Sequence, residues 1–115
     1  MPRRNKFGAK RVGNFASKLE AAVYEILLDK QAMGDISDLK CQAEVRLTDA
    51  NIIYKPDFSF VERGRMAYAE AKGMETASWR IKRRLWTEYG PGLLYIYKGN
   101  HKYPFLNEVI DPRKK

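Results

Sequence analysis

Two short segments of the sequence carry residue types that can perform hydrolytic chemistry together. Pro56-Asp57 is followed, thirteen positions after the aspartate, by Glu70-Ala71-Lys72, a pattern written P-D-x(12)-E-x-K. Phosphodiester hydrolysis uses a divalent cation that polarises the phosphate and lowers the pKa of an attacking water. Because Mg²⁺ prefers carboxylate oxygens and waters, the pattern predicts a metal site on Asp57 and Glu70, with Lys72 directed at the water or the phosphate.

The spacing within the second segment supports this interpretation. Residues two apart on a strand share a face, so the Cα atoms of Glu70 and Lys72 should lie roughly 6–7 Å apart. Ala71 then points its methyl group into the core, and its backbone carbonyl becomes a further candidate metal ligand. The alternative is that Asp57 caps a turn after Pro56 and that the other charged residues are solvated.

Glu20 is the third acidic candidate. Ser17-Lys-Leu-Glu20 has the form of a capping box, in which serine and glutamate satisfy the free amides at a helix start. That role alone explains the glutamate. The functional alternative is that Glu20 leans toward the acidic cluster as an additional metal ligand.

The elements that must position these residues follow from hydrophobic periodicity. The sequence predicts a helix that begins at Phe15 and stops before Gly34, strands over 41–47, 52–60 and 66–72, a helix over 77–89, and a strand over 93–97. The first strand alternates so regularly that Cys41 is expected to be a small buried residue. Pro56 interrupts the second strand.

The helix over 77–89 is expected to carry its apolar stripe on Ile81, Leu85 and Tyr89. Trp79 and Trp86 are interpreted as core residues, with a stacking platform for an exposed base as the alternative. His101, the only histidine, is interpreted as a surface loop residue rather than a general base.

The charge balance favours a polyanionic partner. There are 22 Lys and Arg against 14 Asp and Glu, a net charge of +8, and nucleic acid is the common cytoplasmic polyanion. Residues 1–14 contain no acid and are expected to form a basic arm along DNA phosphates, or else a solvated terminus. The candidate DNA-binding residues are Arg3, Arg4, Lys6, Lys10 and Arg11 in the arm and Arg80, Lys82, Arg83 and Arg84 in the second helix.

The remaining composition favours the cytoplasm. No apolar run approaches the roughly 20 residues of a membrane span, so no membrane partner is expected. The N-terminus has no apolar segment typical of a secretory signal. A single cysteine cannot form an intrachain disulfide, which suits a reducing compartment.

Three blocks of the sequence resemble the phage endonuclease I family of Holliday-junction-resolving enzymes, within the PD-(D/E)XK nuclease superfamily. They are G-A-K-R-V-G-N-F-A-S-K-L-E (8–20), Y-K-P-D-F (54–58) and A-E-A-K-G (69–73), the last followed by a basic helix. Together they span most of residues 8–90. The resemblance implies an α/β fold, with a restriction-endonuclease-like core in which helices flank a central mixed β-sheet. Residues 15–115 would form one such nuclease domain.

The resemblance also implies roles and partners. Glu20, Asp57 and Glu70 would be acidic active-site residues, and Lys72 the catalytic lysine. The expected cofactor is Mg²⁺ or Mn²⁺, two ions per site. The expected substrate is branched double-stranded DNA, cut by a homodimer with exchanged N-terminal segments. A phage-encoded enzyme of this kind would act in the cytoplasm of its bacterial host.

Two other functions fit the same residues. One is a nuclease of this superfamily that acts on DNA ends, flaps or linear duplex. The other, from a different class, is a basic nucleic-acid-binding protein without catalysis. A pure binder would not depend on a metal ion or on the Asp57 carboxylate, so substitution of Asp57 separates it from both nucleases.

Overall fold

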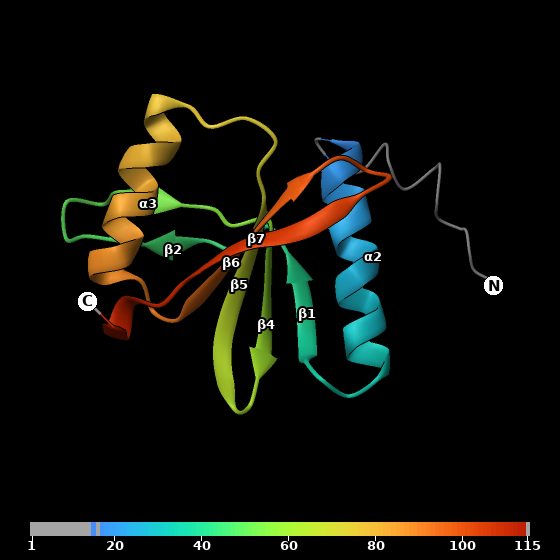
Figure 1. Cartoon of the computed structure of the whole chain (residues 1–115). Coiled ribbons are helices and arrows are strands. Elements are labelled where there is room, and N and C mark those ends of the chain that lie inside the picture. The colour runs from blue at the N-terminus through green and yellow to red at the C-terminus, as the bar shows by residue number, and fades with distance from the viewer. Residues whose placement is uncertain (1–14, 16, 115) are drawn as a thin grey trace.

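The structure is a computed structural model that describes residues 15 and 17–114. Five strands form one sheet in the order β1-β4-β5-β6-β7, and two further strands form a separate hairpin (Figure 1). The helices are α2 (Lys18–Ala32), α3 (Ala77–Tyr89) and the 3₁₀-helix η1 (Pro112–Lys114). The strands are β1 (Ser37–Cys41), β2 (Val45–Arg46), β3 (Ile53–Tyr54), β4 (Phe58–Glu62), β5 (Arg65–Ala71), β6 (Leu93–Gly99) and β7 (Pro104–Ile110).

The central sheet is mixed. A tight turn joins β4 to β5, and its Arg63 and Gly64 have positive φ angles of 54° and 77°, so the two strands pair antiparallel. Strand β6 pairs parallel with β5 because α3 carries the chain back across the sheet between them. Strand β7 forms one edge of the sheet and pairs antiparallel with β6. The fold is therefore α/β with a mixed central sheet, as the sequence predicted, and it is compatible with a restriction-endonuclease-like core.

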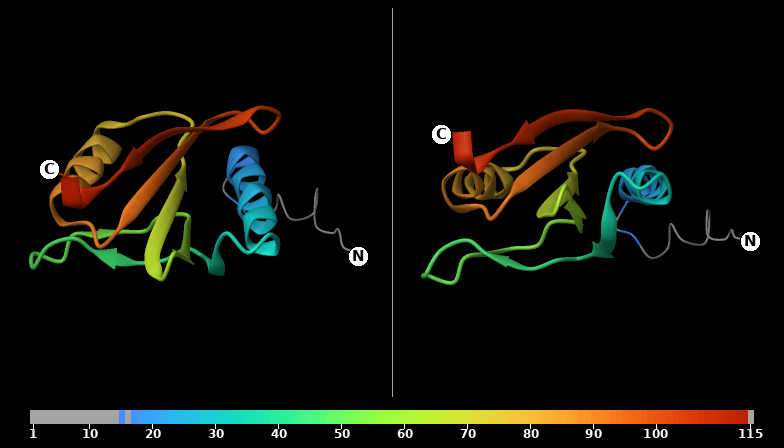
Figure 2. Two further views of the ribbon diagram at one scale, coloured as in Figure 1. Left: turned by 60° about the horizontal axis from the view of Figure 1, so that its bottom comes forward. Right: turned by 90° about the horizontal axis from the view of Figure 1, so that it is seen from below.

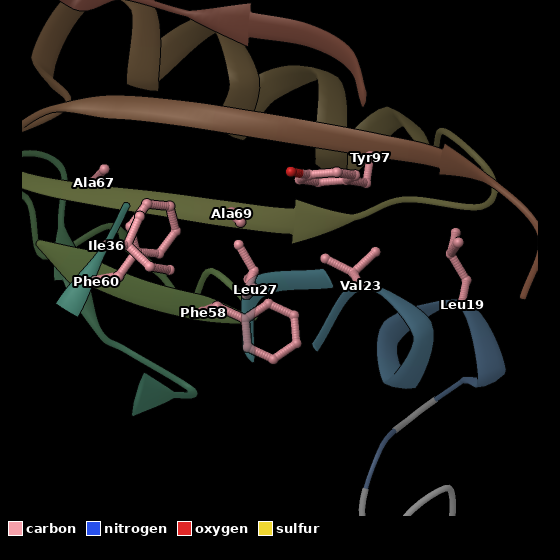
Figure 3. Close-up of a cluster of buried hydrophobic side chains, with 9 residues drawn as sticks. All are labelled: Leu19, Val23, Leu27, Ile36, Phe58, Phe60, Ala67, Ala69 and Tyr97. Carbon is pink, nitrogen blue, oxygen red and sulfur yellow. The ribbon is translucent and has the colours of Figure 1, made fainter. Parts of the chain in front are cut away.

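The two helices cover opposite faces of the sheet. Along β5, Ala67 and Ala69 are buried with the apolar residues of α2, whereas Tyr68 is buried with those of α3. Figure 3 shows Val23 and Leu27 of α2 directed at the Ala69 position. Because side chains alternate along a strand, Glu70 belongs to the α3 face and Ala71 to the α2 face.

Both helices lie where the sequence placed them, but the buried stripe of α3 is different. Trp79 and Trp86 are 3% and 0% exposed, whereas Ile81 is 61% exposed and Tyr89 is 59% exposed. The expected stripe through Ile81 and Tyr89 is therefore wrong, and the interpretation of the tryptophans as core residues is confirmed. The indoles pack on Tyr54 and Tyr68, and this contact sets the rotation of the helix.

The single strand expected over 41–47 is also wrong. Strand β1 ends at Cys41, which is exposed, and Gln42 adopts a left-handed φ of 59°. The amide of Gln42 donates to the carbonyl of Asp57 at 2.8 Å. Beyond this break the chain leaves the central sheet and pairs β2 with β3. Figure 2 shows this hairpin running beside α3 in both views.

The C-terminal strand β7 had no counterpart among the expected elements. Its residues are mostly exposed, with Phe105 at 51% and Val109 at 42%, so they lack the alternation that marks a half-buried strand. His101 is exposed in the loop that precedes it, as expected.

Two further expectations concern the basic arm and the membrane. The basic arm and its five DNA-binding candidates fall within residues 1–14, outside the described residues, and stay a prediction. Within the described part of the chain, no helix is long and apolar enough to cross a membrane.

Candidate active site

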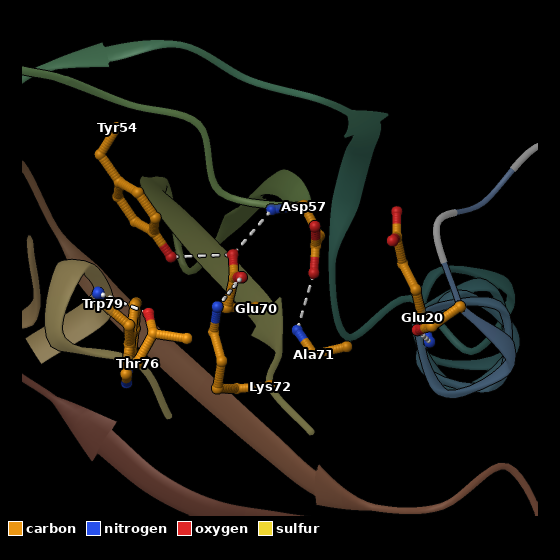
Figure 4. Close-up of polar contacts among 9 residues, drawn as sticks. Glu20, Tyr54, Asp57, Glu70, Ala71, Lys72, Thr76 and Trp79 are labelled. Atoms are coloured by element: carbon orange, nitrogen blue, oxygen red, sulfur yellow. Dashed lines mark hydrogen bonds and ion pairs between the residues drawn. The ribbon is translucent and has the colours of Figure 1, made fainter. Parts of the chain in front are cut away.

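The β4–β5 hairpin closes the thirteen-residue gap between the two acidic segments. Phe58 of β4 pairs with Ala69 of β5, so one step outward along each strand places Asp57 beside Glu70. The hairpin therefore converts the P-D-x(12)-E spacing into two adjacent carboxylates. This register brings together the three residues that the sequence analysis grouped, which are Asp57, Glu70 and Lys72 (Figure 4).

Reciprocal hydrogen bonds hold the two carboxylates in place. The backbone amide of Asp57 donates to Oε1 of Glu70 at 3.2 Å. The backbone amide of Ala71 donates to Oδ2 of Asp57 at 2.8 Å. Each acid thus accepts a hydrogen bond from the backbone of the opposite strand, which fixes both side chains relative to the sheet.

Tyr54 is a site residue that sequence reasoning missed. Its hydroxyl donates to Oε1 of Glu70 at 2.8 Å, and its ring packs against the indoles of Trp79 and Trp86. Burial, followed by the charge and hydrogen bond of Glu70, raises the pKa of Tyr54 far above its ordinary value, so the phenol stays protonated as a donor. The available signal was its position in the Y-K-P-D-F block.

Lys72 lies between a carboxylate and an aromatic ring. Its Nζ is 3.5 Å from Oε2 of Glu70 and 4.8 Å from the ring centroid of Trp79. Its backbone amide donates to the carbonyl of Tyr97 at 2.9 Å, which continues the parallel pairing just past the end of β5. An ammonium group held by an ion pair and a cation–π contact occupies a narrow range of positions beside Glu70.

The buried carboxylates are costly to ionise. Burial, and then the charge of Asp57, raises the pKa of Glu70 to about 7. Burial also raises the pKa of Asp57, although the Ala71 amide and Lys72 oppose that rise. Paired acids that resist ionisation are a perturbed arrangement of the kind found at functional sites, and a bound cation would favour both ionised forms.

The donor set fits a hard divalent cation. Among the described residues, Oδ1 of Asp57 accepts no hydrogen bond and Oε2 of Glu70 has only its 3.5 Å ion pair with Lys72, so one oxygen of each acid could bind a metal. Such oxygens suit Mg²⁺ or Mn²⁺. The use of the Ala71 carbonyl as a ligand, and the number of ions per site, stay predictions.

Glu20 lies on the opposite side of Asp57 from Glu70 (Figure 4). Its backbone amide donates to Oγ of Ser17 at 3.0 Å, which confirms Ser17 as the helix cap. The carboxylate is 4% exposed and lies on α2, to the right of Asp57 in Figure 4, whereas Glu70 lies to the left. Among the described residues, no three His, Cys, Asp or Glu side chains are grouped closely enough to hold a metal ion. Metal binding by Glu20 therefore stays a prediction.

The basic residues of α3 do not form a single face. Arg83 makes an ion pair with Glu108 of β7, whereas Arg80 and Arg84 are exposed. Lys82 is half-buried and lines a cleft together with Lys72. Phosphate contact by these four residues stays a prediction.

The fold and the site together define an α/β protein with a buried glutamate, a half-buried aspartate and a lysine at the ends of two central strands. The chain belongs to the family described as "Protein of unknown function (DUF1064)", which matches residues 4–103. None of the curated proteins matches the chain. The family description assigns no activity, so functional inference depends on the geometry of the site.

The acidic pair also makes a prediction about stability. With EDTA present at pH 8, Glu70→Gln should raise the midpoint of thermal unfolding by at least about 5 °C, and the gain should shrink toward pH 5. The folded-state pKa of Glu70 is raised from 4.5 to about 7. Its contribution to stability is therefore complete below pH 4.5 and is lost as the pH rises through 7. Glutamine carries no charge and keeps an oxygen for Tyr54 and the Asp57 amide.

Thermal unfolding followed by circular dichroism measures this difference. Glu25→Gln, on the exposed side of α2, is the matched control and should leave the midpoint unchanged at both pH values. A Glu70→Gln midpoint equal to or below that of the wild type at pH 8 would show that the carboxylate pair is not under electrostatic strain.

Proposed function

We propose that this protein is a metal-dependent DNA endonuclease that hydrolyses phosphodiester bonds. The observation that carries the proposal is the convergence of Asp57, Glu70 and Lys72 at the adjoining ends of β4 and β5, with the Lys72 ammonium 3.5 Å from Glu70. A P-D-x(12)-E-x-K pattern arises by chance in unrelated chains. Here the same residues lie together, Glu70 is buried and Asp57 half-buried, and each acid is hydrogen-bonded to the other's strand.

The roles of the residues follow from their contacts. Asp57 and Glu70 would hold Mg²⁺ or Mn²⁺, which when bound polarises the phosphate and lowers the pKa of the attacking water. Tyr54 and the Asp57 amide fix one oxygen of Glu70, so that its other oxygen keeps one direction. Lys72 presents a fixed positive charge and donates to a phosphate oxygen or to the attacking water, where negative charge develops during hydrolysis.

Nucleic acid is the substrate class that the charge favours. The net charge of +8 gives a small domain a strong attraction for phosphates. Lysine and arginine that bind phosphates supply affinity, whereas the acidic pair supplies chemistry. These two functions are assigned to different residues and can be separated by substitution.

The resemblance to junction-resolving enzymes supports branched DNA as the preferred substrate. A homodimer with exchanged N-terminal segments, with Glu20 completing the partner's site, stays a prediction of that resemblance. Within the single chain described, α2 packs on its own sheet through Leu19, Val23 and Leu27. Action in a bacterial cytoplasm belongs to the same prediction.

A cleavage assay tests the proposal and its substrate preference. In Mg²⁺, the purified protein should cut a labelled four-way junction at least about tenfold faster than a linear duplex of the same sequence. Equal rates would leave the nuclease function standing but assign it to ends, flaps or ordinary duplex. Binding of both substrates without cleavage of either, in Mg²⁺ or Mn²⁺, would favour the non-catalytic binder.

A further inference from the structure

A cleft opens beside the candidate active site, between strand β3 and the first two turns of α3. It has a volume of about 460 Å³, and its lining includes Lys55, Lys72, Lys82, Thr76 and Ser78. We call it the lysine groove. Figure 2 shows the β2–β3 hairpin and α3, which form its two walls, lying side by side.

The lysine groove is positively charged. Three lysines line it against one acid, Glu44. The carboxylate of Glu44 is 3.5 Å from Nζ of Lys55, with the two side chains 63% and 59% exposed. Exposed ion pairs of this kind contribute little, so Lys55 can exchange Glu44 for a stronger anion. The helix dipole of α3 also favours negative charge at the first turn of the helix.

The lysine groove is continuous with the site because two residues belong to both. Lys72 lines the groove and forms the ion pair with Glu70. Tyr54 also lines the groove and donates its hydroxyl to Glu70. An anion in the groove would therefore lie next to two residues, Tyr54 and Lys72, that also contact Glu70.

The groups that reach the groove select phosphate rather than a nucleobase. Tyr54 and Trp79 are only 6% and 3% exposed, so their rings offer little surface on which a base could stack. The accessible groups are the lysine ammonium groups, the hydroxyls of the exposed residues Thr76 and Ser78, and the side chain of Ile53, which is 42% exposed but has no ring for stacking. From Thr76 to Lys82 the helix rises about 9 Å, enough for two consecutive phosphates of one strand.

We propose that the lysine groove holds the sugar–phosphate backbone of the DNA strand that is cut, with Lys55 and Lys82 contacting two consecutive phosphates on one side of the scissile one. This inference rests on the proposed nuclease function and extends it. It assigns a role in DNA binding to Lys55 and the β2–β3 hairpin. Of the basic residues of α3, it assigns a phosphate contact beside the active site to Lys82 alone. The strand then passes over Lys72 to reach Asp57 and Glu70.

The test is the salt dependence of binding to a fluorescent four-way junction, measured by anisotropy in EDTA so that nothing is cut. Lys55→Ala combined with Lys82→Ala should reduce the slope of log K against log salt by about 1.8, or about 0.9 for each phosphate contact. Between 50 and 200 mM salt, the wild type should therefore lose about tenfold more affinity than the double variant. Unchanged thermal unfolding would show that the variant is folded.

The matched control removes two charges outside the lysine groove, one on α2 and one at the start of β5. Lys30→Ala combined with Arg65→Ala should leave the slope within about 0.5 of the wild type. Equal losses in both double variants would show only a general charge effect and overturn the lysine groove. A wild-type slope in the Lys55 and Lys82 variant would overturn it as well.

A parallel cleavage assay in Mg²⁺ separates the two proposals. If the wild type cuts DNA but the Lys55 and Lys82 variant keeps the wild-type slope, the nuclease function stands and the groove assignment falls. If the wild type binds DNA through the groove but cuts nothing in either Mg²⁺ or Mn²⁺, the nuclease function falls and with it the position of the groove beside a scissile phosphate.

Discussion

Asp57→Asn is expected to reduce DNA cleavage at least about a thousandfold while leaving the affinity for a four-way junction within about tenfold of the wild type. The carboxylate of Asp57 lies beside Glu70 at the β4–β5 hairpin and would hold the cation. Affinity is expected to come instead from lysine and arginine on phosphates. Single-turnover cleavage and anisotropy on the same labelled junction measure the two effects side by side.

Asparagine is the sharpest replacement because it preserves the hydrogen bond. Its side-chain oxygen can still accept from the Ala71 amide, which donates to Asp57 Oδ2 at 2.8 Å in the wild type. The hairpin should therefore keep its geometry. Asp29→Asn is the control because it removes the same charge at an exposed position of α2. This variant should cut at the wild-type rate. Wild-type cleavage by the Asp57 variant in Mg²⁺ would remove Asp57 from the active site.

The local parts of the site could be predicted from sequence because they depend on short-range geometry. The alternation over 66–72 placed Glu70 and Lys72 on one face of a strand, and in β5 Ala67 and Ala69 pack on one face whereas Tyr68 packs on the other. The Glu62-Arg-Gly-Arg65 turn fixed the hairpin register, which in turn placed Asp57 beside Glu70. Ser17 was identifiable as a helix cap because its partner is three residues away.

The parts that were missed depend on contacts between distant elements. The Y-K-P-D-F block contains Tyr54 but does not reveal its role, because its partner Glu70 is sixteen positions away. The rotation of α3 depends on Trp86 meeting Tyr54 and Tyr68 from separate strands. The break after Cys41 depends on a hydrogen bond between Gln42 and Asp57. Each is decided by tertiary packing, which overrides local periodicity.

Removal of the metal ion is expected to have an effect as large as that of the Asp57 substitution. Without a cation, Asp57 and Glu70 repel each other, and burial raises the pKa of both. Neither the phosphate nor the attacking water is then activated. The protein should stay folded in EDTA, because the hydrogen bonds from Tyr54, Asp57 and Ala71 to the acidic pair need no metal. Loss of activity would therefore reflect chemistry and not unfolding.

The most direct measurement is single-turnover cleavage of an end-labelled four-way junction by one wild-type preparation in three conditions: with Mg²⁺, with EDTA, and with Mg²⁺ restored in excess over EDTA. We predict cut strands in the first condition, a rate at least about a thousandfold lower in the second, and recovery in the third. Circular dichroism should be the same throughout. Cleavage at the full rate in EDTA, or no cleavage in Mg²⁺ or in Mn²⁺ by a folded protein that binds the junction, would contradict a metal-dependent nuclease.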